Sequence, residues 1–87
     1  MKHYEIASQI FRSGTSIGAN IREAQNAESK RDFIHKFKIS AKEADELEYW
    51  LLLCERSKYY PNPIGLKEDL TPIIKIISKI ISSSKKN

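Results

Sequence analysis

The chain has 87 residues, of which 40% are hydrophobic and 30% charged, a balance that fits one small globular domain and excludes two independent ones. The single cysteine, Cys54, cannot form an internal disulfide, and no Cys/His spacing is typical of a zinc site. The 15 basic and 11 acidic residues give a net charge of +4, which permits an acidic partner without demonstrating one. No apolar run is typical of a membrane-spanning helix or a signal peptide, so we expect a cytoplasmic protein without membrane contact.

The first predicted element is a helix over about residues 3–26. Apolar residues recur at helical spacing from Ile6 to Ile21. Gly14 and Gly18 interrupt this pattern, and each costs a helix about 1 kcal/mol relative to alanine. Either the helix continues and presents a bare side that another backbone can approach closely, or it breaks and a neighbouring serine caps a second helix. We favour the continuous helix.

The second predicted element is a long amphipathic helix over about residues 30–57. Apolar residues from Phe33 to Cys54 recur every three or four positions, which is typical of one helix face. Ser29 predicts the start, because it can cap the helix in a capping-box variant with Asp32. The run Pro61-Asn62-Pro63 predicts the loop that follows.

The third predicted element is an isoleucine-rich helix over about residues 64–84. Isoleucine also favours strands, but the segment shows no alternation of apolar and polar residues, and Lys75 and Lys79 are four apart as on a helix. The apolar band is wider than a coiled-coil seam, which implies two partner surfaces. Pro72 either lies in the first turn with Thr71 as cap or kinks a helix that begins near Pro63.

The three segments together predict an all-α fold, an antiparallel bundle of three long helices that forms one domain over residues 1–87. Three helices of this length bury only a modest core. The broad apolar face of the last helix would remain partly exposed to water in a monomer, so we expect self-association.

Several short motifs together resemble one bacterial family. The chain is similar to the four-helix bundle protein family, also called the 23S rRNA intervening-sequence protein family, over most of its length. The resemblance implies a helical bundle that assembles as a ring-like homopentamer. It also implies kinship with the accessory protein of diversity-generating retroelements, which binds nucleic acid and a reverse transcriptase through a basic surface. The matching motifs are the run from Arg12 to Ala24 (RSGTSIGANIREA), Ala27-Glu28-Ser29, Asp32-Phe33, Ala41-Lys42-Glu43-Ala44 and Tyr49-Trp50-Leu51.

Family members usually carry a further amphipathic helix ahead of the segment that begins here near Tyr4. The resemblance therefore implies a four-helix bundle that in this chain lacks most of its first helix. Either the sequence is truncated, or this member works with three helices. A missing helix would expose core surface on the other three, which strengthens the expectation of self-association and weakens the transfer of the pentamer geometry.

Two rows of basic residues are candidate contacts for the phosphates of RNA or DNA. The simpler interpretations are a solvated helix face and, near a helix C-terminus, a favourable interaction with the helix dipole. Five copies in a ring would raise the net charge to about +20, a field able to hold nucleic acid. The candidate residues are Lys30, Arg31, Lys38 and Lys42, with His35 beside them, on the second helix, and Lys75 and Lys79 on the third.

The family motif includes polar residues for which we favour a structural role over a ligand-binding one. Asn20 and Glu23 lie one turn apart beside Gly14 and Gly18. We expect both to fix the helix register by bonding to Arg12 or to a partner helix.

The aromatic and acidic residues of the second half each leave two interpretations open. Tyr49 and Trp50, with Tyr59 and Tyr60 in the following loop, can stack on bases or flank a core or an interface. The acidic residues do not converge as a catalytic or metal site would require, so they indicate charge complementarity between subunits or a solvated face. In the first case Lys38 and Lys42 would pair with a neighbour's acids, namely Glu43, Asp45 or Glu46.

We find no pattern typical of a catalytic site, a cofactor or a metal, so we do not expect an enzyme. The function expected is that of a non-catalytic, homo-oligomeric protein that binds the backbone of RNA or DNA, as an accessory to a partner such as a nucleic-acid enzyme. The alternative is a structural or protein-interaction module with no role in nucleic-acid binding.

Overall fold

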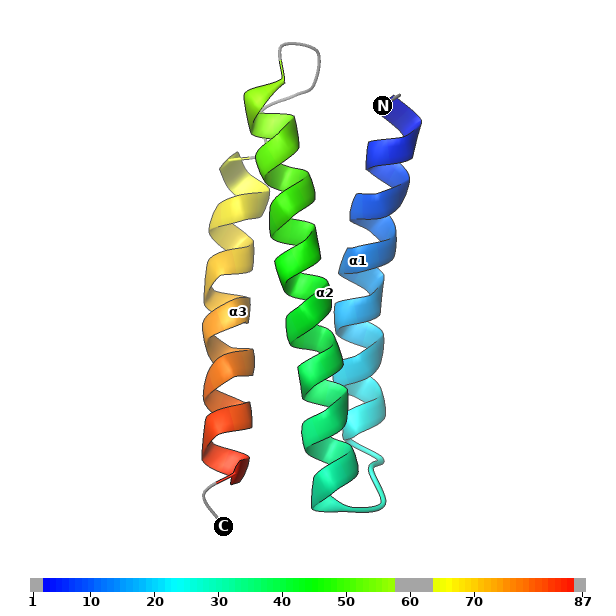
Figure 1. The fold of residues 1–87 in the computed structure, drawn as a ribbon, viewed down its shortest axis with the longest axis vertical. Helices are drawn as coiled ribbons and strands as arrows, with labels where there is room; N and C mark the ends of the chain where they lie inside the picture. The colour runs from blue at the N-terminus through cyan, green and yellow to red at the C-terminus, as the bar shows by residue number, and fades with distance from the viewer. Residues whose placement is uncertain (1–2, 58–63, 86–87) are drawn as a thin grey trace.

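The computed structural model describes residues 3–57 and 64–85. They form three α-helices: α1 (His3–Ala24), α2 (Lys30–Arg56) and α3 (Ile64–Lys85). Helix α2 lies between the other two, both of which pack on it, and consecutive helices run in opposite directions (Figure 1). The predicted all-α fold and the three predicted helices are confirmed.

Helix α1 runs without a break through Gly14 and Gly18, as expected. A Cβ atom placed on either glycine would meet nothing within 4 Å. No other backbone in the described part of the chain therefore approaches this bare side. The two glycines weaken the helix without allowing a closer packing contact among residues 3–57 and 64–85.

The start of α2 is fixed by the predicted cap. Ser29 has an extended backbone, and its Oγ accepts a hydrogen bond from the backbone N–H of Asp32 at 3.0 Å. This bond satisfies one of the four free N–H groups in the first turn. The predicted loop at Pro61–Pro63, together with Tyr59 and Tyr60, lies outside the described residues.

Helix α3 begins at Ile64 and contains Pro72 in its interior. Thr71 is therefore not an N-cap, and its hydroxyl donates instead to the carbonyl of Lys67, one turn earlier, at 3.1 Å. Because proline has no N–H, the carbonyl of Glu68 loses its usual helical partner. Of the two alternatives for Pro72, the helix that begins near Pro63 is the one observed.

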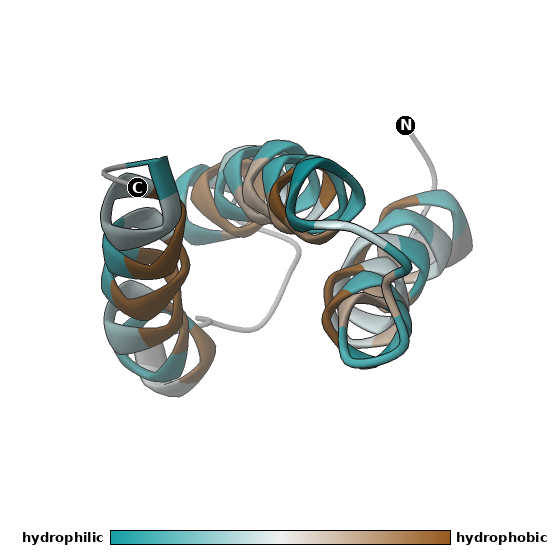
Figure 2. Cartoon of the chain, turned by 90° about the horizontal axis from the view of Figure 1, so that it is seen from below, coloured by the Kyte–Doolittle hydropathy of each residue, from teal (hydrophilic) through white to brown (hydrophobic). Residues whose placement is uncertain are grey.

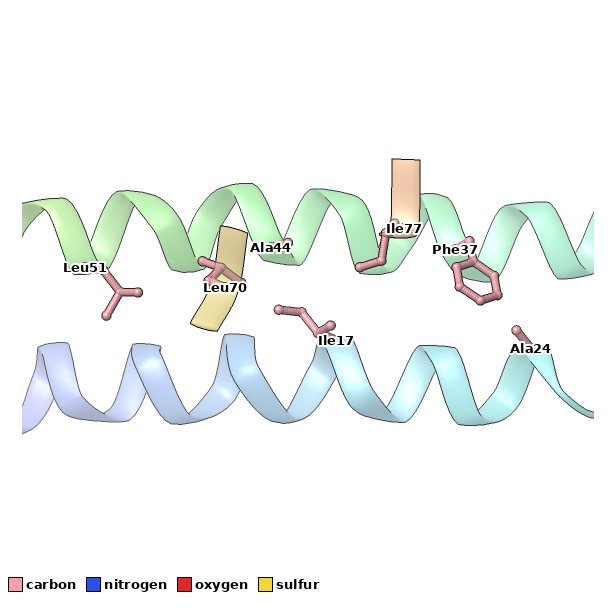
Figure 3. Close-up of a cluster of buried hydrophobic side chains, with 7 residues drawn as sticks. All are labelled: Ile17, Ala24, Phe37, Ala44, Leu51, Leu70 and Ile77. Carbon is pink, nitrogen blue, oxygen red and sulfur yellow. The ribbon is translucent and has the colours of Figure 1, made fainter. Parts of the chain in front are cut away.

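The core follows the seam where α2 meets both neighbours (Figure 3). Seen along the helices, the hydrophobic sides of α1 and α3 turn inward beneath α2 (Figure 2). Ser40 of α2 is fully buried, and its Oγ donates to the backbone carbonyl of Ile17 at 2.9 Å, which satisfies the hydroxyl. The buried residues of this cluster are Ile17, Ala24, Phe37, Ala44, Leu51, Leu70 and Ile77.

The wide apolar band of α3 is only partly buried. Leu70 and Ile77 are buried in the core, whereas Leu66, Ile73 and Ile76 are exposed. Part of this face is therefore open in the single chain, as the width of the band predicts.

Candidate functional site

A basic cleft lies where the first turns of α2 meet the last turn of α3. Its volume is about 490 Å³. The antiparallel arrangement brings these two regions together, although they are far apart in the sequence. The residues lining the basic cleft are Lys30, Arg31, Ile34, His35 and Lys38 of α2 and Ser84 and Lys85 of α3.

The charges of the basic cleft are placed partly against the preference of the helices. Lys30 and Arg31 lie at the N-terminus of α2, where the helix dipole disfavours cations by a few tenths of a kcal/mol. Lys85 lies at the C-terminus of α3, where the dipole favours a cation. Helix stability thus explains Lys85 but does not explain Lys30 and Arg31.

Three cations of the basic cleft are not neutralised by an ion pair among the described residues. Within residues 3–57 and 64–85, Arg31, Lys38 and Lys85 form no ion pair, and no acidic residue lines the basic cleft. The nearest acid in sequence, Asp32, lines a second cleft of about 360 Å³ that shares Arg31 and His35 with the first. The geometry therefore concentrates positive charge in a concave surface of phosphate size or larger.

The structure brings together only part of the predicted basic set. Lys30, Arg31 and Lys38 line the basic cleft, whereas the exposed Lys42, Lys75 and Lys79 do not. Sequence reasoning missed Ser84 and Lys85, because it placed the basic row of the third helix at Lys75 and Lys79. The available signal was topological: in an antiparallel pair, the end of α3 returns to the start of α2.

A cluster of polar side chains joins α1 to α2 at a distance from the basic cleft. Arg12 donates to Glu43 Oε2 at 2.8 Å and to Glu46 Oε1, and it also donates to Gln9 Oε1 at 3.0 Å. Trp50 Nε1 donates to the same oxygen of Glu46 at 3.3 Å. The hydrogen bond from Arg12, followed by that from Trp50, holds the pKa of Glu46 below its usual value. Two of the acids expected to meet a neighbouring subunit are thus paired inside the chain.

Of the motif residues Asn20 and Glu23, only Glu23 contacts a partner helix as expected. Asn20 Nδ2 donates to the carbonyl of Ser16 in its own helix at 2.9 Å, and Arg12 is bound to α2 rather than to Asn20. Glu23 reaches α2, where Lys36 Nζ donates to it at 3.2 Å. Among the described residues, the register is therefore tied by the Arg12 and Glu23 contacts, while Asn20 bonds locally, because its short side chain reaches only the preceding turn.

The remaining chemistry of the described residues is limited. Cys54 is buried on the apolar side of α2, and burial raises the pKa of its thiol. No three His, Cys, Asp or Glu side chains among residues 3–57 and 64–85 gather as a metal site would require. None of the three described helices combines the length and the apolar content that a membrane span needs.

Comparison with known proteins places this arrangement in a family. The model of the 23S rRNA-intervening sequence protein family matches residues 1–83. The fold is similar to the crystal structure of a protein of unknown function from the S23 ribosomal protein family of Bacteroides thetaiotaomicron, with a TM-score of 0.82 and 50% sequence identity over 87% of this chain and 72% of that chain. The curated proteins contain no significant match. The chain therefore belongs to the 23S rRNA-intervening sequence protein family.

Proposed function

We propose that this protein is a non-catalytic, homo-oligomeric helical bundle that binds the backbone of RNA or DNA through the basic cleft, as an accessory to a nucleic-acid enzyme. The observation that carries the proposal is the convergence of Lys30, Arg31, Lys38 and Lys85 from two helices on one concave surface. Phosphates at successive backbone positions are the ligand that such a surface fits, because each cation can replace a condensed counterion.

The placement of Arg31 and Lys38 supports this proposal further. Neither side chain is used to stabilise the described fold through an ion pair, and both are exposed. A polyanion would also relieve the repulsion between the cations of α2 and Lys85 of α3. Binding should therefore raise the melting temperature of the protein as well as being detectable directly.

The test is a fluorescence anisotropy titration of labelled 20-nucleotide RNA and DNA with the purified chain. We expect micromolar, sequence-tolerant binding that weakens steeply between 50 and 200 mM salt, as counterion release requires. The double charge reversal Arg31→Glu with Lys38→Glu should weaken binding at least about tenfold and flatten the salt dependence.

The matched control for the charge reversal is Arg22→Glu, which changes an exposed cation at the end of α1 that lines neither cleft. It lowers the net charge by two, half as much as the double reversal, without touching the basic cleft. Binding that ignores salt, or an Arg22→Glu variant as weak as the double reversal, would contradict a site at the basic cleft.

A second candidate, a protein-interaction module, is favoured by the exposed apolar face of α3. Leu66 and Ile73 line an apolar cleft of about 240 Å³ between α1 and α3, with Gly14 on its opposite wall. Light scattering of the purified chain tests both candidates, since each includes association. A multimer indifferent to nucleic acid favours the interaction module, and a concentration-independent monomer contradicts the homo-oligomer.

A further inference from the structure

The solvent-facing side of α2 carries a row that extends beyond the basic cleft. We call Arg31, Lys38, Lys42, Asp45 and Tyr49 the outer row. Successive members are separated by seven, four, three and four residues, which keeps them on one face of a helix. All five side chains are exposed. At 1.5 Å per residue the row extends about 27 Å, from the basic cleft to an aromatic ring.

The ring of Tyr49 is exposed to solvent and is also fixed in position by its neighbours. Its residue is 53% exposed, yet its ring meets that of Trp50 in an edge-on contact with centroids 5.2 Å apart. Trp50 is in turn fixed by its Nε1–H bond to Glu46, which Arg12 also holds. An aromatic face kept in place beside a row of cations is the arrangement on which nucleic-acid bases stack.

The charge along α2 changes from basic at the Arg31 end of the outer row to acidic near Tyr49. Glu43 and Glu46 would repel phosphates, and Arg12 pairs with both from the α1 side, which offsets one of their two negative charges. Asp45 is the acidic member of the outer row, between Lys42 and Tyr49. The exposed Glu48 directly precedes Tyr49, so a strand that followed the row would contact the cations first and reach the ring past Asp45 and Glu48.

We propose that Tyr49 stacks on a base of a single-stranded nucleic acid whose backbone follows the outer row from the basic cleft. This inference rests on the proposed function and adds the class of ligand. In a duplex the bases are stacked on one another and only the backbone and groove edges are open, so the ring has no base face to contact. A single strand presents bases and phosphates together.

The experiment compares three labelled 20-nucleotide ligands at low salt: oligo(dT), its duplex with oligo(dA), and an abasic strand with the same phosphate spacing. Oligo(U) provides the RNA arm. The wild-type chain should bind oligo(dT) and oligo(U) at least about fivefold more tightly than the abasic strand, because stacking adds to the phosphate contacts. The fluorescence of Trp50 should change on binding oligo(dT) and stay unchanged with the abasic strand, since its ring lies against that of Tyr49.

The variants separate the ring from its surroundings. Tyr49→Ala should lose between about fivefold and a hundredfold in affinity for oligo(dT) and nothing for the abasic strand. Tyr49→Phe keeps the ring and should retain the wild-type affinity. Phe11→Ala removes a ring that is 73% exposed on α1, away from the outer row, and is the matched control that should change nothing. Far-ultraviolet circular dichroism checks that each variant is folded.

Three results overturn the inference, and they are distinguishable. If Tyr49→Ala binds oligo(dT) as the wild type does while the Arg31 and Lys38 reversals still weaken binding, stacking is wrong and the basic cleft stands. If no ligand binds at low salt, the proposed function fails and this inference fails with it. Tight binding of the abasic strand by the wild type, equal to that of oligo(dT), also contradicts stacking.

Discussion

The single substitutions Ile77→Ala and Ile76→Ala, at neighbouring positions of α3, should have very different effects on the free energy of unfolding. Ile77 is 1% exposed and lies in the core against α2, whereas Ile76 is 59% exposed. Each substitution removes three carbons, which corresponds to about 2.4 kcal/mol of transfer free energy for a fully buried side chain at about 0.8 kcal/mol per carbon. The cavity left at Ile77 adds to this, so we expect Ile77→Ala to lower the free energy of unfolding by about 3 to 4 kcal/mol.

For Ile76→Ala the same reasoning gives a small loss. Less than half of the side chain is buried, so the lost transfer free energy is about 1 kcal/mol, and the better helix propensity of alanine offsets part of it. We expect a net loss of about 0.5 kcal/mol. The assay is urea unfolding followed by circular dichroism, at two protein concentrations so that any contribution from association is visible.

Equal losses for the two variants at low protein concentration would refute the position of α3 on α2, because they would require Ile76 to be buried within the single chain. A loss for Ile76→Ala that grows with protein concentration would instead show that this face is covered by another copy. Ile77→Val, which removes one carbon, provides an intermediate point at about 1 kcal/mol.

Three further outcomes follow from the local geometry. Gly14→Ala should raise the free energy of unfolding by about 1 kcal/mol in urea unfolding, because the added Cβ meets nothing within 4 Å and alanine favours the helix; a loss would show that another chain approaches there. Pro72→Ala should stabilise α3 by about 2 kcal/mol in the same assay, since it restores the backbone bond to the Glu68 carbonyl; an unchanged midpoint would contradict this. The contribution of Glu46, whose pKa is lowered by Arg12, is present above the ordinary value of 4.5 and is lost as pH falls through the folded value. Glu46→Gln should therefore reduce the acid sensitivity of thermal unfolding between about pH 5 and pH 3, and an unchanged pH profile would refute the role of the Arg12 contact.

The three helices and the start of α2 were predictable because the forces that determine them act over a few residues. The Ser29 cap predicts the start of α2, and the apolar spacing from Phe33 to Cys54 predicts its length. Both predictions are confirmed. The continuity of α1 through Gly14 and Gly18 was predictable for a similar reason: the apolar face persists on both sides of the glycines.

What the sequence left open depends on how the helices meet. The apolar band of α3 contains both Ile76 and Ile77, and only the packing of α3 against α2 decides that Ile77 is buried and Ile76 exposed. The acidic partners of Arg12 lie more than thirty residues away in α2, so nothing local to Arg12 identifies them.

The candidate site shows the same division. Sequence alone identified Arg31 and Lys38 as exposed cations on one face of a helix, because helical spacing fixes which residues share a face. Only the antiparallel return of α3 places Lys85 beside them and makes the surface concave. Periodicity determines which residues share a face of each helix. The contacts between helices join residues far apart in the chain, and they determine which faces form the core, the ion pairs and the basic cleft.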